Sequence, residues 1–315
     1  MKQLKFGILS TSSIAPRFIA ALREAGVGQI LALSSRSLEK AREKADQWGI
    51  PVAYGSHLQL LQDADINIVY ISAVNAAHYP LAKAALMKGK HVVCEKPCTT
   101  TAGHTKELFA LAKEKGLFFM EAQKMLFLPA ILEVAKRIAR GDLGEITMAE
   151  FSHSFSAAYN TWMYDKAAGG GPLLSSGIYA VQLLLWLFGP IGEIRGVKSS
   201  VENGTEWQYV LTGNTESGVL FSIKNSTRAI LDNTARLYGT KGYVEIPDYW
   251  KARKAIFHIK GEEPQTAEFL CEHELVYEVE HIVKCMQEGK LTSPVVTEQL
   301  SVAGISALEK VSENW

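Results

Sequence analysis

The sequence predicts an α/β protein of two domains, in which a doubly wound parallel sheet is followed by a domain with an antiparallel sheet. At 315 residues the chain exceeds the usual size of one domain. From Lys5 to Glu121, strand-like runs alternate with helical patterns, which indicates a parallel sheet with right-handed crossovers. From Gly144 onward, short strands are separated by Asn-Gly, Glu-Ser-Gly and Thr-Lys-Gly turns, which favour antiparallel pairing. We therefore expect domains over residues 1–122 and 123–315.

The hydrophobic periodicity of the first domain predicts its elements in order. We expect strands at Lys5–Leu9, Gly28–Ser34, Val52–Tyr54, Ile66–Ala73, around Val92 and at Leu117–Glu121. We expect helices from Ile14 to Gly26, over Leu38–Trp48 and His57–Gln62, from Asn75 to Gly89, and over Thr101–Lys115.

The second domain is expected to mix helices with short strands. Helices are predicted at Ala130–Arg140, from Leu173, at His273–Gln287 and at Thr297–Ser312. Strands are predicted at Gly144–Phe155, Arg195–Val201, Trp207–Thr212, Gly218–Asn225, Thr234–Tyr238, Tyr243–Ile246 and Ala255–Ile259.

Composition excludes several classes of function. Lys plus Arg and Asp plus Glu both number 33, so no charge imbalance suggests a nucleic-acid or membrane partner. The N-terminus runs directly into a strand without a charged leader, and no apolar run approaches ~18 residues. We therefore expect a cytoplasmic protein. The four cysteines lack zinc-type spacing, and His78, His91, His104 and His153 fall on separate predicted elements, so we expect no metal site.

The turn after the first strand has the position of a dinucleotide-binding loop. Strand, Ser10-Thr11-Ser12-Ser13-Ile14 and helix follow one another, and a G-x-G-x-x-[GA] fingerprint would fall on Ser10, Ser12 and Ala15. Serine at the glycine positions still leaves backbone N–H groups at a helix N-terminus, where a pyrophosphate can bind. It forbids the easiest positive-φ geometry. Taken alone, the pattern is also that of a plain strand-to-helix turn.

The end of the second predicted strand favours NADP over NAD. An enzyme that selects NAD normally has an acid here for the ribose hydroxyls, whereas Ser35 and Arg36 leave room and positive charge for a 2′-phosphate. NAD stays open, because Arg36 can equally be a solvated residue at a helix start.

The exit of the strand that ends near Ala73 supplies two more candidates. Asn75 is a plausible N-cap of the next helix, and Asn75 and His78 can line the cofactor groove. Taken alone, His78 is more simply read as a histidine on the helix surface.

The run Glu95-Lys96-Pro97 is the centre of the functional argument. It follows the buried valines of the fifth strand, and ligands of doubly wound sheets bind outside the carboxyl ends of the strands. A lysine at a buried strand end is costly without a task or a partner. The competing interpretation is a local Glu-Lys pair that closes the strand.

A second constellation lies in the second domain, around Gly169-Gly170-Gly171. A helix from Leu173 would place Ser175 and Tyr179 four residues apart on one face, where both can address one substrate. Tyr159 and Trp162 suggest an aromatic wall. Core packing explains the aromatic side chains equally well.

The chain resembles the glucose-fructose oxidoreductase / inositol dehydrogenase (Gfo/Idh/MocA) family, nearest the branch that contains trans-dihydrodiol dehydrogenase. The resemblance covers nearly the whole chain in order. It is carried by Glu95-Lys96-Pro97, Met120-Glu121-Ala122, Gly169-Gly170-Gly171, Gly177-Ile178-Tyr179 and Trp186-Leu187-Phe188-Gly189.

The resemblance implies a Rossmann domain followed by an α/β domain with a large, mostly antiparallel sheet through which homodimers or homotetramers form. It also implies a catalytic Lys96, an often cis Lys-Pro bond, and Tyr179 as acid/base. Two positions depart from the family pattern. Ser175 stands where an Asp is common, and Leu126-Phe127-Leu128 stands where Arg-Phe-His is common.

The resulting hypothesis is an NAD(P)-dependent oxidoreductase that transfers a hydride between the nicotinamide and a secondary alcohol or carbonyl of a sugar, polyol or diol. Lys96 and Tyr179 are the catalytic candidates, and Tyr159, Trp162, Ser175 and Tyr179 are the substrate candidates. The alternative is a catalytically silent NAD(P)-binding sensor or partner-binding protein. The cofactor-binding candidates are Ser10, Thr11, Ser12, Ser13, Ile14, Ser35, Arg36, Ala73, Asn75, His78, Glu95, Lys96 and Gln123.

Overall fold

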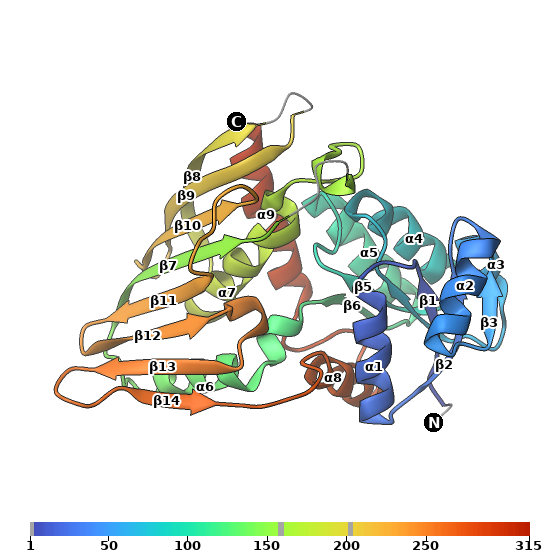
Figure 1. The fold of residues 1–315 in the computed structure, drawn as a ribbon, viewed down its shortest axis with the longest axis horizontal. Helices are drawn as coiled ribbons and strands as arrows, with labels where there is room; N and C mark the ends of the chain where they lie inside the picture. Colours follow the sequence, from blue (N-terminus) through green and yellow to red (C-terminus); the bar gives the residue numbers. More distant parts are fainter. Residues whose placement is uncertain (1–2, 157–160, 201–203) are drawn as a thin grey trace. The chain divides into compact units, whose positions relative to one another are not determined.

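A computed structural model describes residues 3–156, 161–200 and 204–315 (Figure 1). The chain divides into two compact units. The first contains Met1–Gln123 and His273–Ser301, and the second contains Lys124–Glu272 and Val302–Trp315. These units differ from the predicted ranges 1–122 and 123–315, because residues 273–301 pack with the first unit.

The first unit is built on a six-stranded parallel sheet of order β3-β2-β1-β4-β5-β6, which confirms the predicted doubly wound fold. The strands are β1 (Lys5–Leu9), β2 (Gln29–Ser34), β3 (Val52–Tyr54), β4 (Ile68–Ile71), β5 (His91–Glu95) and β6 (Phe119–Ala122). The order reverses between β1 and β4, and doubly wound sheets bind ligands at such a switch point.

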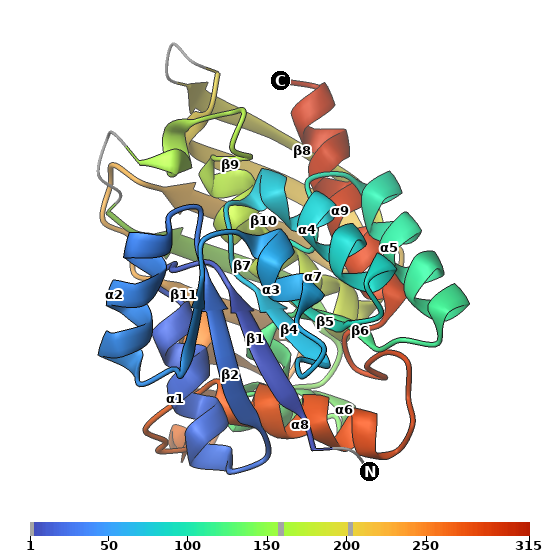
Figure 2. The same cartoon turned by 90° about the vertical axis from the view of Figure 1, so that its right-hand side faces the viewer.

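The first unit also contains helices, several of which contact one another. They are α1 (Ala15–Ala25), α2 (Leu38–Trp48), α3 (His57–Gln62), α4 (Asn75–Met87), α5 (Ala102–Lys115) and α8 (Val276–Gln287). Figure 2 shows α4 beside α5 and α1 beside α8, and α3 also contacts α4. Side-chain caps fix where α2 and α5 begin, because the Ser37 and Thr101 hydroxyls accept hydrogen bonds from the N–H groups of Lys40 and His104.

The second unit contains an eight-stranded sheet of order β14-β13-β12-β11-β7-β10-β9-β8. Its strands are β7 (Ile146–Ser154), β8 (Ile191–Ser200), β9 (Glu206–Thr215), β10 (Leu220–Ser226), β11 (Thr234–Gly239), β12 (Gly242–Pro247), β13 (Lys254–Ile259) and β14 (Gln265–Glu268). β7 and β10 pair in parallel and the other neighbours are antiparallel, so the predicted mostly antiparallel sheet is confirmed.

Helices cover one face of this sheet. These are α6 (Pro129–Ala139), α7 (Ile178–Phe188) and the later part of α9 (Glu298–Glu313) (Figure 1). The unit also contains the shorter segments η1 (Lys124–Phe127), η2 (Trp162–Tyr164), η3 (Leu173–Gly177) and η4 (Tyr249–Lys251). α6 contacts β13 and β14, whereas η3 contacts β10 and α7 contacts β9. No helix of the described residues is long and apolar enough to cross a membrane.

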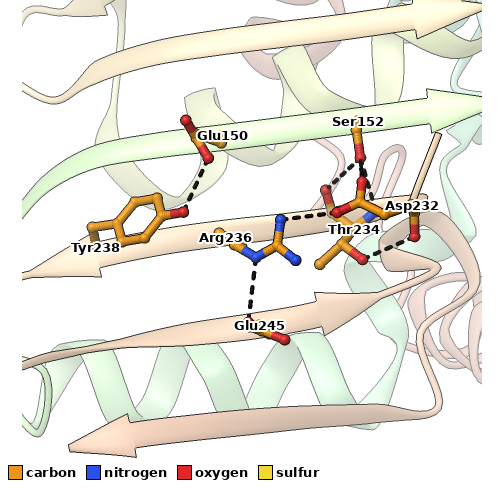
Figure 3. A network of polar contacts seen from close by, with 7 residues as sticks. All are labelled: Glu150, Ser152, Asp232, Thr234, Arg236, Tyr238 and Glu245. Atoms are coloured by element: carbon orange, nitrogen blue, oxygen red, sulfur yellow. Dashed lines mark hydrogen bonds and ion pairs between the residues drawn. The ribbon is translucent and has the colours of Figure 1, made fainter.

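The other face of the sheet, here called the open sheet face, carries the alternate side chains of the same strands. Ala149 and Phe151 of β7 are fully buried, while Met148 is 43% exposed. Polar side chains form a network along this face (Figure 3). Arg236 lies at its centre, 2.9 Å from Asp232 Oδ2 and 3.3 Å from Glu245 Oε1.

Candidate active site

The carboxyl edge of the parallel sheet brings the cofactor-binding candidates together in the first unit. Backbone hydrogen bonds tie the strand exits to one another: the Ser10 N–H donates to Ser34 O at 3.1 Å, and the Ser72 N–H donates to Leu9 O at 3.2 Å. Ser35 and Gln123 directly follow β2 and β6, and both are buried. Residues far apart in sequence thus lie along one edge.

The β1–α1 turn adopts a geometry that glycine normally supplies. Ser10 has φ = 108°, although a Cβ atom disfavours this region. The next turn residues lead into α1: the Ser12 carbonyl accepts from the Ala15 N–H at 3.2 Å, and Ile14 is the N-cap. The Ser12 hydroxyl donates to Ser72 Oγ at 2.9 Å and so ties the turn to the exit of β4.

This turn fits a dinucleotide. With φ at 108°, Ser10 has a backbone conformation that glycine adopts most readily, and the turn leads into an α1 of 11 residues with Pro16 in its first turn. Among the described residues, the backbone N–H groups of Ser12, Ser13 and Ile14 donate to no other group, and such N–H groups just before a helix suit the negative charge of a pyrophosphate. Residues 10–14 would therefore hold the diphosphate of a dinucleotide.

The exit of β2 combines a buried serine with an exposed arginine. Ser35 is 7% exposed and its N–H donates to Tyr54 O at 3.1 Å. The Arg36 side chain is exposed, and among the described residues it forms no ion pair. Such a guanidinium suits the additional 2′-phosphate that distinguishes NADP from NAD.

The exit of β4 corrects two sequence predictions. Asn75 is the first residue of α4 rather than its N-cap, which is Val74 without a side-chain cap. His78 is 1% exposed, so it is not the surface histidine that we considered. Its Nδ1 lies 2.8 Å from Pro97 O and its Nε2 lies 3.0 Å from Ala73 O. His78 therefore connects the exits of β4 and β5.

Lys96 directly follows β5 and precedes a cis Lys96-Pro97 bond. Desolvation lowers the pKa of its ammonium, and the charges of Glu95 and Glu121 oppose that shift. Glu95 is held by the Tyr70 hydroxyl, which donates to its Oε1 at 2.6 Å. The Tyr70 ring in turn stacks on Phe18 at 3.7 Å between centroids.

Glu121 supports the same segment from β6. It is fully buried and accepts hydrogen bonds from the Cys98 N–H at 2.9 Å and the Ser301 hydroxyl at 2.6 Å. Sequence reasoning assigned no role to Glu121 or to Tyr70. A signal was present for Glu121, because an acid at the end of an apolar strand is rarely buried without a purpose.

The second unit presents Ser175 and Tyr179 differently from the prediction. Leu173–Gly177 form a π-helical turn, which has more residues per turn than the α-helix that we expected before α7. The Ser175 hydroxyl donates to the carbonyl of Gly171, which precedes this turn, and lies 3.0 Å from Met163 Sδ. Tyr179 is buried in the first turn of α7, with 7% exposure.

The glycine turn of the second unit is anchored by Glu206 of β9. Glu206 Oε1 accepts from the Leu173 N–H at 2.6 Å, and burial raises the pKa of this carboxyl. A Cβ on Gly171 would approach the same oxygen to 2.5 Å, which explains the glycine. Trp162 is 37% exposed, and the predicted substrate contact Tyr159 lies outside the described residues.

Family models match both parts of the chain. One described as "Oxidoreductase family, NAD-binding Rossmann fold" covers residues 4–123, and one described as "GFO/IDH/MocA C-terminal domain" covers residues 131–245. Together with the doubly wound sheet and its polar carboxyl edge, these matches define an oxidoreductase with an NAD(P)-binding Rossmann domain. More particularly, the chain belongs to the Gfo/Idh/MocA family, as its motifs predicted.

Named relatives support this assignment over most of the chain. Trans-1,2-dihydrobenzene-1,2-diol dehydrogenase of Bos taurus is 32% identical over 93% of this chain and 91% of that protein. Among solved structures, a 3-ketoreductase from Actinomadura kijaniata with NADP and TDP-benzene has a TM-score of 0.90 at 20% identity, covering 99% and 98% of the two chains. Levoglucosan dehydrogenase with NADH and levoglucosan has a TM-score of 0.88 at 19% identity, also covering 99% and 98%. The structural likeness shows the shared fold.

Proposed function

We propose that this protein transfers a hydride between NADP and a secondary alcohol or carbonyl of a sugar, polyol or diol. The observation that carries the proposal is Lys96, a desolvated ammonium at the carboxyl edge of a dinucleotide-binding sheet. The names of the relatives, which include a diol dehydrogenase, agree with an alcohol or carbonyl substrate. They leave sugar, polyol and diol as the substrate class to be screened.

In this proposal Lys96 acts on the substrate oxygen. A bound nicotinamide supplies the hydride donor or acceptor. The Lys96 ammonium donates a hydrogen bond to the oxygen on which negative charge develops. Its lowered pKa brings proton release closer to neutral pH, while the negative charges of Glu95 and Glu121 act in the opposite direction and raise this pKa. Tyr179 carries the proton, a role that rests on the family resemblance.

Replacing the lysine tests the proposal. Lys96→Ala should lower kcat by about a hundredfold or more while the affinity for NADPH stays within a few-fold, because the ammonium acts on the reacting oxygen. Lys88→Ala is the matched control, since Lys88 is exposed just before the same strand. Loss of cofactor binding together with turnover would instead assign Lys96 a structural role.

A spectrophotometric screen of sugars, polyols and diols with NADPH and NADH separates the proposal from the sensor alternative. Tight cofactor binding without turnover on any compound would favour a silent NAD(P)-binding protein. For Tyr179, the test is Tyr179→Phe, and an unchanged rate across the pH range would remove this phenol from the mechanism.

We also propose that NADP is preferred over NAD, with Arg36 contacting the 2′-phosphate. Arg36→Ala should weaken NADPH binding by about tenfold or more and leave NADH binding nearly unchanged, because only NADPH carries the extra phosphate. Equal losses for the two cofactors would contradict this assignment.

We further propose that the protein forms a homodimer or homotetramer through the open sheet face, a proposal that exposed apolar side chains on this face support. Leu220, 54% exposed, pairs with Met148 on β7, and Val197, 72% exposed, pairs with Val210 on β9. Apolar side chains in register on one face favour a protein partner over solvent. Leu220→Arg should shift the mass in sedimentation toward the monomer, whereas Leu270→Arg, outside the strands, should not. The cysteines are free, which suits the cytoplasmic location that we propose.

A further inference from the structure

His57 lies beside the arginine to which we assign the cofactor phosphate. It is the first residue of α3, and its Nδ1 lies 2.8 Å from the hydroxyl of Ser34, the last residue of β2. Ser34 is fully buried, so this contact fixes the ring against the sheet. The positive charge of Arg36 acts on the ring. The imidazole and the guanidinium therefore share one exit of the sheet.

The contacts of the His57 ring leave one nitrogen for a ligand. The Ser34 hydroxyl also lies 3.4 Å from the Ile8 carbonyl, which can accept its proton. In the imidazolium form, Nδ1–H donates to Ser34 Oγ while Ser34 donates to Ile8, so every proton on this side has an acceptor. Nε2–H then remains to bond an anion. No described residue forms a hydrogen bond with this nitrogen.

Charges around the ring favour an anion partner. Arg36 is the charged group of the described residues that acts on His57, and it lowers the pKa of the imidazole, adding to the larger effect of desolvation. The carboxylate at the other end of α3, Asp63, accepts from the Tyr54 hydroxyl at 2.9 Å. A cation and a titratable ring with no carboxylate between them form a site for a dianion.

We propose that His57 is a second cofactor-specificity residue, which joins Arg36 in binding the 2′-phosphate of NADP and takes up a proton when that phosphate binds. This inference rests on the proposed NADP preference. The phosphate replaces water around the ring and supplies the negative charge that the free site lacks, so the bound state favours imidazolium. Affinity for the 2′-phosphate must then fall as the pH rises through the neutral range.

The sign of the proton exchange makes the test specific. A phosphate monoester has a second pKa near 6, so binding beside Arg36 alone would release protons from it. Protonation of His57 has the opposite sign. Titration calorimetry of adenosine 2′,5′-bisphosphate in buffers of different ionisation enthalpy should show net proton uptake by the wild type. Its affinity should also fall by about three- to tenfold between about pH 6.5 and 8.

His57→Asn should abolish the uptake and flatten this dependence, because asparagine keeps a donor toward Ser34 but does not titrate. His57→Gln provides a second variant, should the first fold poorly. His91→Asn is the matched control. His91 is a half-buried histidine at the amino end of β5, its Nδ1 accepts from the Phe118 N–H at 2.9 Å, and burial also lowers its pKa. This control should behave as the wild type does.

The outcomes separate this inference from the proposed function. An unchanged proton count in both His57 variants overturns the role of His57 and leaves the NADP preference standing. Equal loss of ADP and bisphosphate binding in these variants also overturns it, because it would show a structural role. If the wild type binds ADP as tightly as the bisphosphate, the NADP preference fails and the inference fails with it.

Discussion

Replacing Ser10 with glycine should stabilise the protein. Ser10 has φ = 108°, and a non-glycine residue held in such a region costs about 1–3 kcal/mol. Glycine removes that strain but adds about 0.5–1 kcal/mol of unfolded-state entropy. The net gain in the free energy of unfolding is therefore about 1 kcal/mol. Among the described residues no hydrogen bond of the Ser10 side chain offsets it.

Urea unfolding followed by tryptophan emission measures this gain. Trp48 reports on the first unit, since the other five tryptophans lie in the second. Ser10→Ala should gain nothing, because alanine keeps the strain. Ser12→Gly is the contrasting control and should lose about 1–2 kcal/mol, because it removes the hydrogen bond to Ser72 and adds chain entropy. A destabilised Ser10→Gly variant would refute the strain argument.

Three further changes test other buried groups. Glu121→Gln removes a negative charge that raises the pKa of Lys96, so the limb of the pH–rate profile that depends on this lysine should move to lower pH. A limb at the same pH would show that the charge of Glu121 does not influence the titration of Lys96. Lys90→Met should lower the free energy of unfolding in urea by about 2–4 kcal/mol, because the buried ammonium donates at 2.6 and 2.7 Å to two backbone carbonyls. An unchanged free energy of unfolding would show that water can take the place of the ammonium at these carbonyls. His281 has its pKa lowered to about 4, chiefly by desolvation, so the unfolded chain binds the proton more readily. The contribution of His281 to the free energy of unfolding should be complete above about pH 6.5 and should fall by about 1–2 kcal/mol toward pH 4 once solvent screening is allowed for. In His281→Gln, this part of the pH dependence of the free energy of unfolding should be absent.

The sequence determined the architecture and the centre of the site. Alternating strand and helix patterns specified the parallel sheet, because hydrophobic period is a local property of the chain. Turn residues specified the antiparallel strands of the second sheet for the same reason. Lys96 was found because the charged pair Glu95-Lys96 at the end of an apolar strand stands out without any knowledge of its spatial neighbours.

Only the tertiary structure decided how distant residues meet. His78 becomes buried through its contacts with carbonyls at the exits of β4 and β5, and no local pattern encodes that. The glycine-like φ of Ser10 is set by the neighbouring strand exits rather than by the serine itself, whose Cβ opposes it. The local pattern likewise does not encode the contact between α8 and α1, the parallel pairing of β7 with β10, or the π-helical turn before Tyr179. The sequence determines which side chains are available for chemistry. Their pKa values and hydrogen-bond partners depend on the tertiary structure, because residues distant in the sequence supply them.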